Sequence, residues 1–194
     1  MAESEDRKYR RLDPRSLRGL AHPLRMRLLS TLRHDGPATA SQLAEKLGES
    51  SGATSYHLRQ LAAHGFVEDD PERGKGRERW WRAAKEGTRF DDSLFDNPDP
   101  AVRGAANLFM HEIATHHTEE VGTWLGTAHD WPEAWRRSSD LSDFTLRLTP
   151  AQAFELNTKL HDLIESYTEL APGPEAEDAA QVRMHLHSFP RSTD

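Results

Sequence analysis

The sequence predicts a mainly helical fold with a small β component, that is, an α+β protein. Apolar residues recur at helical spacing over most of residues 14–64. Residues 66–83 hold two short extended runs around a glycine-rich tip, which is the pattern of a β-hairpin. A longer periodic run over residues 101–125 predicts a helix of about 37 Å. With 194 residues and 36% hydrophobic side chains, the chain can bury a sizeable core.

Composition excludes several classes of site. The chain has no cysteine, which excludes disulfides, thiolate zinc sites, iron–sulfur clusters and cysteine nucleophiles. No stretch approaches the ~20 apolar residues of a membrane span, and the first fifteen residues contain no apolar signal region. We therefore expect a cytoplasmic protein without a membrane anchor, and we predict no cofactor and no metal.

Four short helices are predicted before the hairpin. Asp13 is an N-cap followed by proline at the first helical position, and a His-Pro pair at 22–23 separates this helix from the next. Thr39 or Ser41 can cap the third helix, and Gly48 ends it as a residue with positive φ. The fourth helix runs from about residue 51 to residue 64.

The order of these elements predicts a winged helix-turn-helix. In that arrangement the second helix of the motif fits the major groove of DNA, and the hairpin reaches adjacent phosphates. On the fourth helix, Thr54, Leu58 and Leu61 have the spacing of a buried face. The opposite, solvent-facing residues are then Ser51, Gly52, Ser55, Tyr56, Arg59 and Ala63.

That solvent-facing side has the chemistry of a base-reading surface. Its small residues allow close approach, the hydroxyls of Ser51 and Ser55 can bond bases or phosphates, and Tyr56 can meet a thymine methyl. Arg59 can pair with guanine or phosphate. His57, at the edge of the face, suits an orienting role or a phosphate contact. We predict that these residues and Gly52 bind DNA.

Four cations fall within seven residues of the hairpin. They suit phosphate or minor-groove contacts that set affinity rather than sequence preference. By themselves they are equally consistent with a solvated hairpin that binds nothing. They are Arg73, Lys75, Arg77 and Arg79.

Residues 12–84 resemble the winged helix of ArsR-type bacterial transcriptional regulators. The resemblance rests on the motifs AHPLRMRLL, SQLAEKLG, SYHLRQL, GFV and GRERWWR. It implies a homodimer that binds double-stranded DNA at inverted-repeat operators, usually represses, and releases DNA when an effector binds. The recognition positions of the family fall on Ser51, Ser55, Tyr56, His57 and Arg59. Thiol-based sensing is excluded because the chain has no cysteine.

The charge balance divides the chain into two parts. Residues 1–90 have 18 Lys and Arg against 13 Asp and Glu, whereas residues 91–194 have 7 against 19. The basic part suits a polyanionic partner. We predict a DNA-binding domain over 12–90, a proline-containing linker over 91–100, and a dimerisation domain over 101–190 that could also take a small-molecule effector.

The predicted second domain begins with the long helix and continues as strand, helix and strand. The strands are expected at residues 143–148 and 182–189, where apolar and polar residues alternate. Between them, Thr149-Pro150-Ala151-Gln152 is a capping box that begins a helix ending near Leu170. A helix as long as 101–125 suggests contact with a second subunit.

Two other classes of function compete with this interpretation. The first is a metal-dependent hydrolase, because His111, His116 and His117 lie on the long helix. Zinc proteases need histidines four residues apart, whereas these follow His111 by five and six, so a solvated helix face is favoured. His185 and His187 share one face of a predicted strand. The second class is a protein-interaction module, because winged helices also bind proteins.

Overall fold

The computed structural model describes residues 9–73, 79–85, 87–173 and 175–192. The chain divides into two compact units, residues 1–122 and residues 123–194, and each is considered by itself. Within the described residues, no helix is both long and apolar enough to span a membrane.

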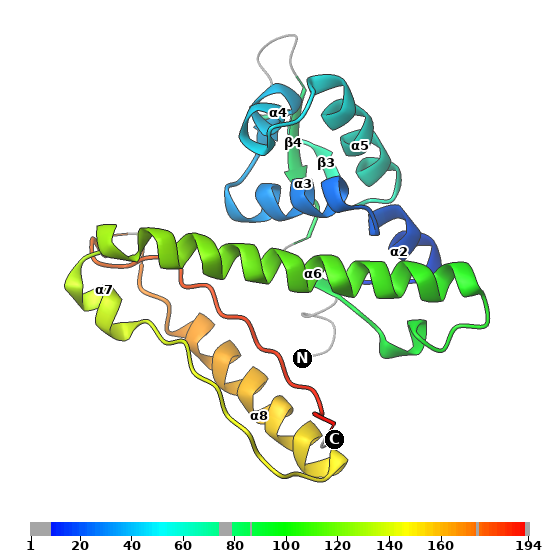
Figure 1. Cartoon of the computed structure of the whole chain (residues 1–194). Coiled ribbons are helices and arrows are strands. Elements are labelled where there is room, and N and C mark those ends of the chain that lie inside the picture. Colours follow the sequence, from blue (N-terminus) through cyan, green and yellow to red (C-terminus); the bar gives the residue numbers. More distant parts are fainter. Residues whose placement is uncertain (1–8, 74–78, 86, 174, 193–194) are drawn as a thin grey trace. The chain divides into compact units, whose positions relative to one another are not determined.

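Four helices build the first part of unit 1 (Figure 1). They are α2 (Pro14–Leu20), α3 (Pro23–His34), α4 (Ala40–Leu47) and α5 (Ser51–Ala63). The predicted start signals are confirmed, because the Asp13 and Thr39 side chains each accept a hydrogen bond from the backbone N–H three residues later. Gly48 has φ 69°, as predicted for the residue that ends α4.

The predicted hairpin is also present. Strand β3 (Val67–Asp69) pairs antiparallel with β4 (Trp80–Ala83), and β4 pairs on its other edge with β2 (Ala38–Thr39). Trp81 is buried and Trp80 is half-buried, as expected for neighbours on a strand. Of the predicted hairpin tip at residues 71–76, residues 71–73 form a turn and residues 74–76 lie outside the described residues.

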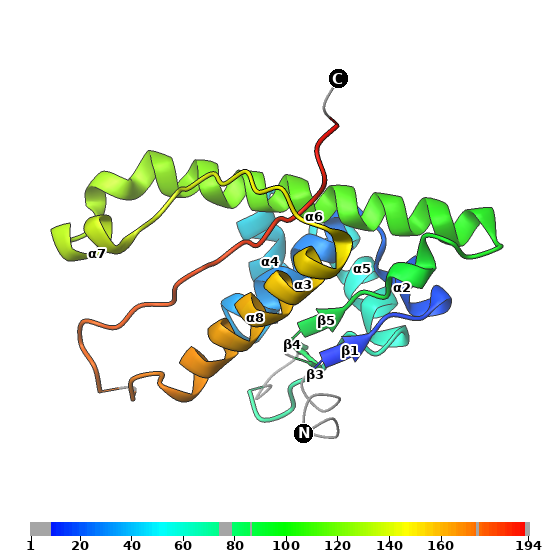
Figure 2. The same ribbon diagram turned by 90° about the horizontal axis from the view of Figure 1, so that it is seen from below.

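A second, two-stranded sheet was not predicted. Strand β1 (Tyr9–Arg11) pairs in parallel with β5 (Gly87–Arg89), and the two lie side by side in Figure 2. Each strand has three residues and no alternation of apolar and polar side chains, so neither gives a recognisable strand signal. This sheet brings the residues before α2 next to the residues after the hairpin.

The long helix is confirmed as α6 (Pro100–Thr127), which follows the short 3-10 helix η1 (Asp92–Leu94). Val102, Ala106 and Phe109 of α6 are buried in the same apolar cluster as the leucines of α2, α3 and α5. The Phe109 ring stacks on Phe90, with 5.6 Å between ring centroids. The core of the winged helix therefore includes the first turns of α6.

In unit 2, the capping box over residues 149–152 begins α8 (Pro150–Glu169) as predicted. The 3-10 helix η2 (Ala128–Asp130) and α7 (Glu133–Ser138) come before it. The predicted strands at 143–148 and 182–189 are wrong for the single chain, since both segments are irregular. A strand exists only when a neighbouring backbone completes its hydrogen bonds, and the described residues offer neither segment such a neighbour.

Candidate nucleic-acid interface

Helix α5 is fixed against the core by one face and exposes the other. Thr54, Leu58 and Leu61 have no exposed surface at all, which confirms the predicted buried side. Because this side is fixed, the orientation of the opposite side is fixed as well. Of the predicted site residues on α5, Ser51, Gly52, Tyr56 and Arg59 are exposed, whereas Ser55 and His57 are half-buried.

The exposed side of α5 has no negative side chain, because residues 51–63 contain neither Asp nor Glu. Ser50 caps the helix by accepting a hydrogen bond from the Ala53 amide at 3.2 Å. Further along, Tyr56 is 53% exposed, so its ring is available to a partner. Arg59 donates from Nε to the Ser55 carbonyl at 3.1 Å and carries its charge on the same side.

His57 packs sideways rather than pointing away from the helix. Its ring centroid lies 4.4 Å from that of His22, the N-cap residue of α3, and 5.1 Å from that of Tyr56. Burial lowers the pKa of His57, and the nearby His22 and Arg25 lower it further. The lowered pKa favours the neutral imidazole, whose ring packs edge-on against that of Tyr56.

Arg25 of α3 is a candidate site residue that the sequence interpretation missed. Its charge interacts with both Tyr56 and His57. One guanidinium nitrogen donates to the Arg18 carbonyl at 3.2 Å, which directs the half-buried side chain. The position of Arg25 outside the leucine stripe of α3 was visible in the sequence. Its proximity to α5 depends on how the two helices cross, which the sequence did not reveal.

Two of the four predicted wing cations, Arg73 and Arg79, lie in the described part of the chain, and both are beside an acid and an aromatic ring. Arg79 pairs with Asp69 at 3.1 Å, and its guanidinium lies 4.2 Å from the centroid of the Trp81 ring. Arg73 lies 3.8 Å from Asp70. The Arg79–Asp69 pair is exposed on both sides and contributes little stability, so a phosphate can replace its carboxylate. Asp70, in contrast, is buried. Lys75 and Arg77, the other predicted wing residues, lie outside the described residues.

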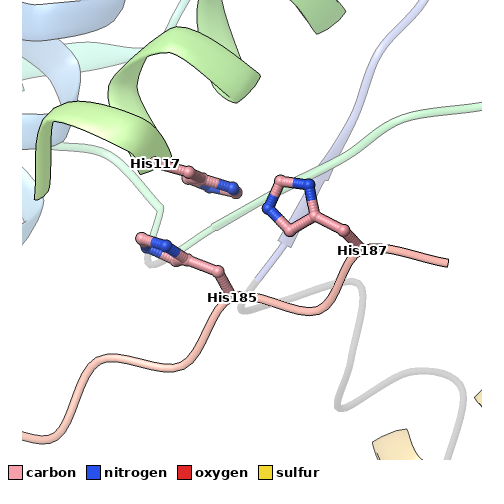
Figure 3. Close-up of side chains that lie close together, drawn as sticks. All are labelled: His117, His185 and His187. Carbon is pink, nitrogen blue, oxygen red and sulfur yellow. The ribbon is translucent and has the colours of Figure 1, made fainter. Parts of the chain in front are cut away.

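The histidines considered for a metal site are divided between α6 and the segment after α8. On α6, His116 Nε2 lies 3.2 Å from the Ser30 hydroxyl of α3 and 3.6 Å from a Glu120 carboxylate oxygen. This is a packing contact between α3 and α6. Figure 3 draws His117 of unit 1 together with His185 and His187 of unit 2. Within unit 2, the rings of His185 and His187 lie 6.4 Å apart, on an irregular segment rather than on the predicted strand.

Together these features define a winged helix-turn-helix protein. Helices α4 and α5 are joined at a left-handed glycine, and the β3–β4 hairpin follows them directly. Residues 20–70 match the family described as "Helix-turn-helix domain". The match and the fold confirm the helix-turn-helix on which the resemblance to ArsR-type regulators rests.

Two solved structures are similar over part of the chain. One is the homodimeric winged helix-turn-helix DNA-binding domain Mb0332 from Mycobacterium bovis, described as a possible ArsR-family transcriptional regulator. It has 24% identity and a TM-score of 0.34, over 55% of this chain and 81% of that one. The other is a mutant of Lactococcus lactis ZitR in apo form. It has 18% identity and a TM-score of 0.30, and the similarity covers 74% of this chain and 83% of that one. A search of curated proteins found no match.

Proposed function

We propose that this protein is a transcriptional regulator that binds double-stranded DNA through α5 and the wing. The observation that carries the proposal is the exposed, acid-free side of α5, which is fixed in orientation by the fully buried Thr54, Leu58 and Leu61. A helix enters the major groove only if its outer side chains are small enough to fit and can bond base edges. Ser51, Gly52 and Ser55 meet the first condition, and Tyr56 and Arg59 meet the second.

The roles of the residues follow from their chemistry. Arg59 makes a bidentate contact with guanine or a phosphate, and Tyr56 makes an apolar contact with a thymine methyl. The small polar residues allow the close approach. Arg73, Lys75, Arg77 and Arg79 contact flanking phosphates and so set affinity without reading sequence. Arg25 adds positive charge behind Tyr56, where it can reach the phosphate backbone beside the groove.

The regulator acts as a homodimer on an inverted repeat. Two copies of α5 then enter successive major grooves about 34–36 Å apart, and the two-fold symmetry of the protein matches that of the operator. The resemblance to ArsR-type regulators favours repression over activation. A dimer that covers two turns of a promoter would exclude other proteins from it.

The test begins with a selection step. Genomic DNA of the source organism is fragmented, and the fragments that bind to the purified protein are recovered. Fluorescence anisotropy then measures the affinity of the best fragment and of a scrambled duplex at several salt concentrations. We expect Arg59→Ala and Tyr56→Ala each to cost about 1–3 kcal/mol of discrimination between the two duplexes. The matched control is Arg136→Ala, which removes an exposed arginine of α7.

Two outcomes would contradict the proposal. One is a wild-type protein whose DNA affinity does not fall with salt, since phosphate contacts always release counterions. A winged helix that serves as a protein-interaction module would behave in this way. The other is a pair of α5 variants that discriminate between duplexes as well as Arg136→Ala does.

A further inference from the structure

The described residues of unit 2 form no apolar core of their own. Every fully buried apolar residue in the described part of the chain belongs to unit 1. In the segment between α7 and α8, drawn in yellow in Figure 1, Phe144 is 82% exposed, Leu146 62% and Leu148 42%. Soluble domains rarely leave several such side chains close together in water unless another surface covers them.

This segment has the side-chain pattern of a strand without a neighbour. Phe144, Leu146 and Leu148 alternate with Asp143, Thr145 and Arg147. In an extended chain, the first set lies on one face and the second on the other. Only backbone pairing with another extended segment is missing.

The segment is complementary to itself in one register. If two copies pair antiparallel with Thr145 opposite Thr145, Asp143 of each copy lies opposite Arg147 of the other, and Phe144 opposite Leu146. Both ion pairs then form on one face of the ribbon, and both apolar pairs on the other. A shift that centres the pairing on Leu146 loses both ion pairs, because Asp143 then meets Thr149 and Arg147 meets Thr145.

We propose that residues 141–149 are the central strand of the dimer, paired antiparallel with the same residues of a second copy about a two-fold axis at Thr145. This pairing explains why the predicted strand is absent from the single chain. In this pairing, the apolar face of the strand is covered by a second copy of the same chain. The inference specifies the dimer of the proposed function and does not itself require DNA binding.

The ribbon sets the register of the dimer, and α8 supplies additional apolar surface. Stable interfaces bury about 1,200–2,000 Å² in total, which two short strands alone do not provide. Helix α8 leaves Phe154 76%, Leu163 57% and Tyr167 66% exposed. Apolar side chains on α8 can therefore complete the interface, with the apolar face of the ribbon between the two copies of unit 2.

The first experiment uses the absence of cysteine. Because the chain has none, Thr145→Cys places a single thiol in each copy. Opposed residues on antiparallel strands have Cα atoms about 4.5–5.5 Å apart, which a disulfide can span. We expect mild oxidation of the full-length variant to yield a covalent dimer on non-reducing gels. The control is Ser142→Cys, whose two copies would lie about 20 Å apart along the ribbon.

The second experiment reverses the charges. Asp143→Arg sets arginine against arginine at both ends of the ribbon, and Arg147→Asp sets acid against acid. We expect each change to raise the dimer dissociation constant about tenfold in sedimentation equilibrium. The double variant restores both ion pairs in the opposite sense and should return the constant to near the wild-type value.

Either of two results would overturn the pairing. One is covalent dimer from Thr145→Cys that does not exceed the amount from Ser142→Cys. The other is a double variant no tighter than the single ones, as expected if Asp143 faced a different segment such as 182–189. Were DNA binding and its dependence on Arg59 to persist in either case, the proposed function would stand and only this interface would fall.

Discussion

At the scale of single residues, His57 links the stability of the protein to pH. Burial lowers the pKa of His57 below the ordinary value of 6.5, and burial also lowers the pKa of its neighbour His22. The unfolded chain therefore binds a proton at a higher pH than the folded chain does. The free energy of unfolding then decreases as pH falls through about 6.5 and below.

We predict that His57→Asn reduces this decrease in the free energy of unfolding at low pH. Urea denaturation at about pH 7.5 and pH 5.5 measures the difference in unfolding free energy for wild type and variant. The difference should be smaller in His57→Asn than in the wild type. Equal pH dependence in the wild type and His57→Asn would show that His57 titrates alike in the folded and unfolded chain.

Single residues also show what the sequence could and could not predict about the site. The buried and exposed sides of α5 follow from local periodicity, so Thr54, Leu58 and Tyr56 were placed correctly. The ring contact between His57 and His22, and the position of Arg25 beside Tyr56, depend on the crossing of two helices. That crossing is set by packing of side chains distant in the sequence, and no local pattern encodes it.

At the scale of elements, the close contact between α2 and the end of α5 holds the recognition helix in place. A Cβ atom added at Gly19 of α2 would lie 2.5 Å from Cδ2 and Nδ1 of His64, the residue that follows α5. Only glycine leaves room for the His64 ring at this distance from the α2 backbone. Gly19 was not recognised in the sequence as such a contact.

We therefore expect Gly19→Ala to lower the free energy of unfolding by about 1–3 kcal/mol, because the His64 ring must move. The control is Gly104→Ala, since Gly104 is exposed on α6 with no atom within 4 Å of an added Cβ. It should raise stability by up to about 1 kcal/mol through helix propensity. Both values come from chemical denaturation. A Gly19→Ala variant as stable as Gly104→Ala would contradict the tight contact.

Helices were predicted more reliably than strands, for a physical reason. The hydrogen bonds of α6 and α8 lie within each helix, so periodicity and capping residues suffice to locate them. The bonds of a strand lie between segments. Residues 143–148 alternate as a strand does and yet remain irregular in the single chain, whereas β1 and β5 lack the pattern and nevertheless pair.

At the scale of the whole molecule, the uneven distribution of charge agrees with separate roles for the two parts of the chain. The net positive charge of residues 1–90 accompanies the winged helix, and the acidic remainder includes the segment proposed to pair two copies. If unit 2 sets the spacing of two winged helices, an effector alters DNA affinity only by favouring one spacing over another. DNA would then alter effector affinity by the same factor.

The central claim is that the exposed side of α5 contacts base edges, and photo-crosslinking tests it most directly. Thymines of the selected fragment are replaced by 5-bromouracil, whose bromine takes the place of the methyl group that Tyr56 is proposed to meet. After irradiation, mass spectrometry identifies the attached peptide. We predict attachment within residues 51–63, at Tyr56 above all, and its loss in Tyr56→Ala. Attachment confined to residues 123–194, with none on α5, would contradict the account.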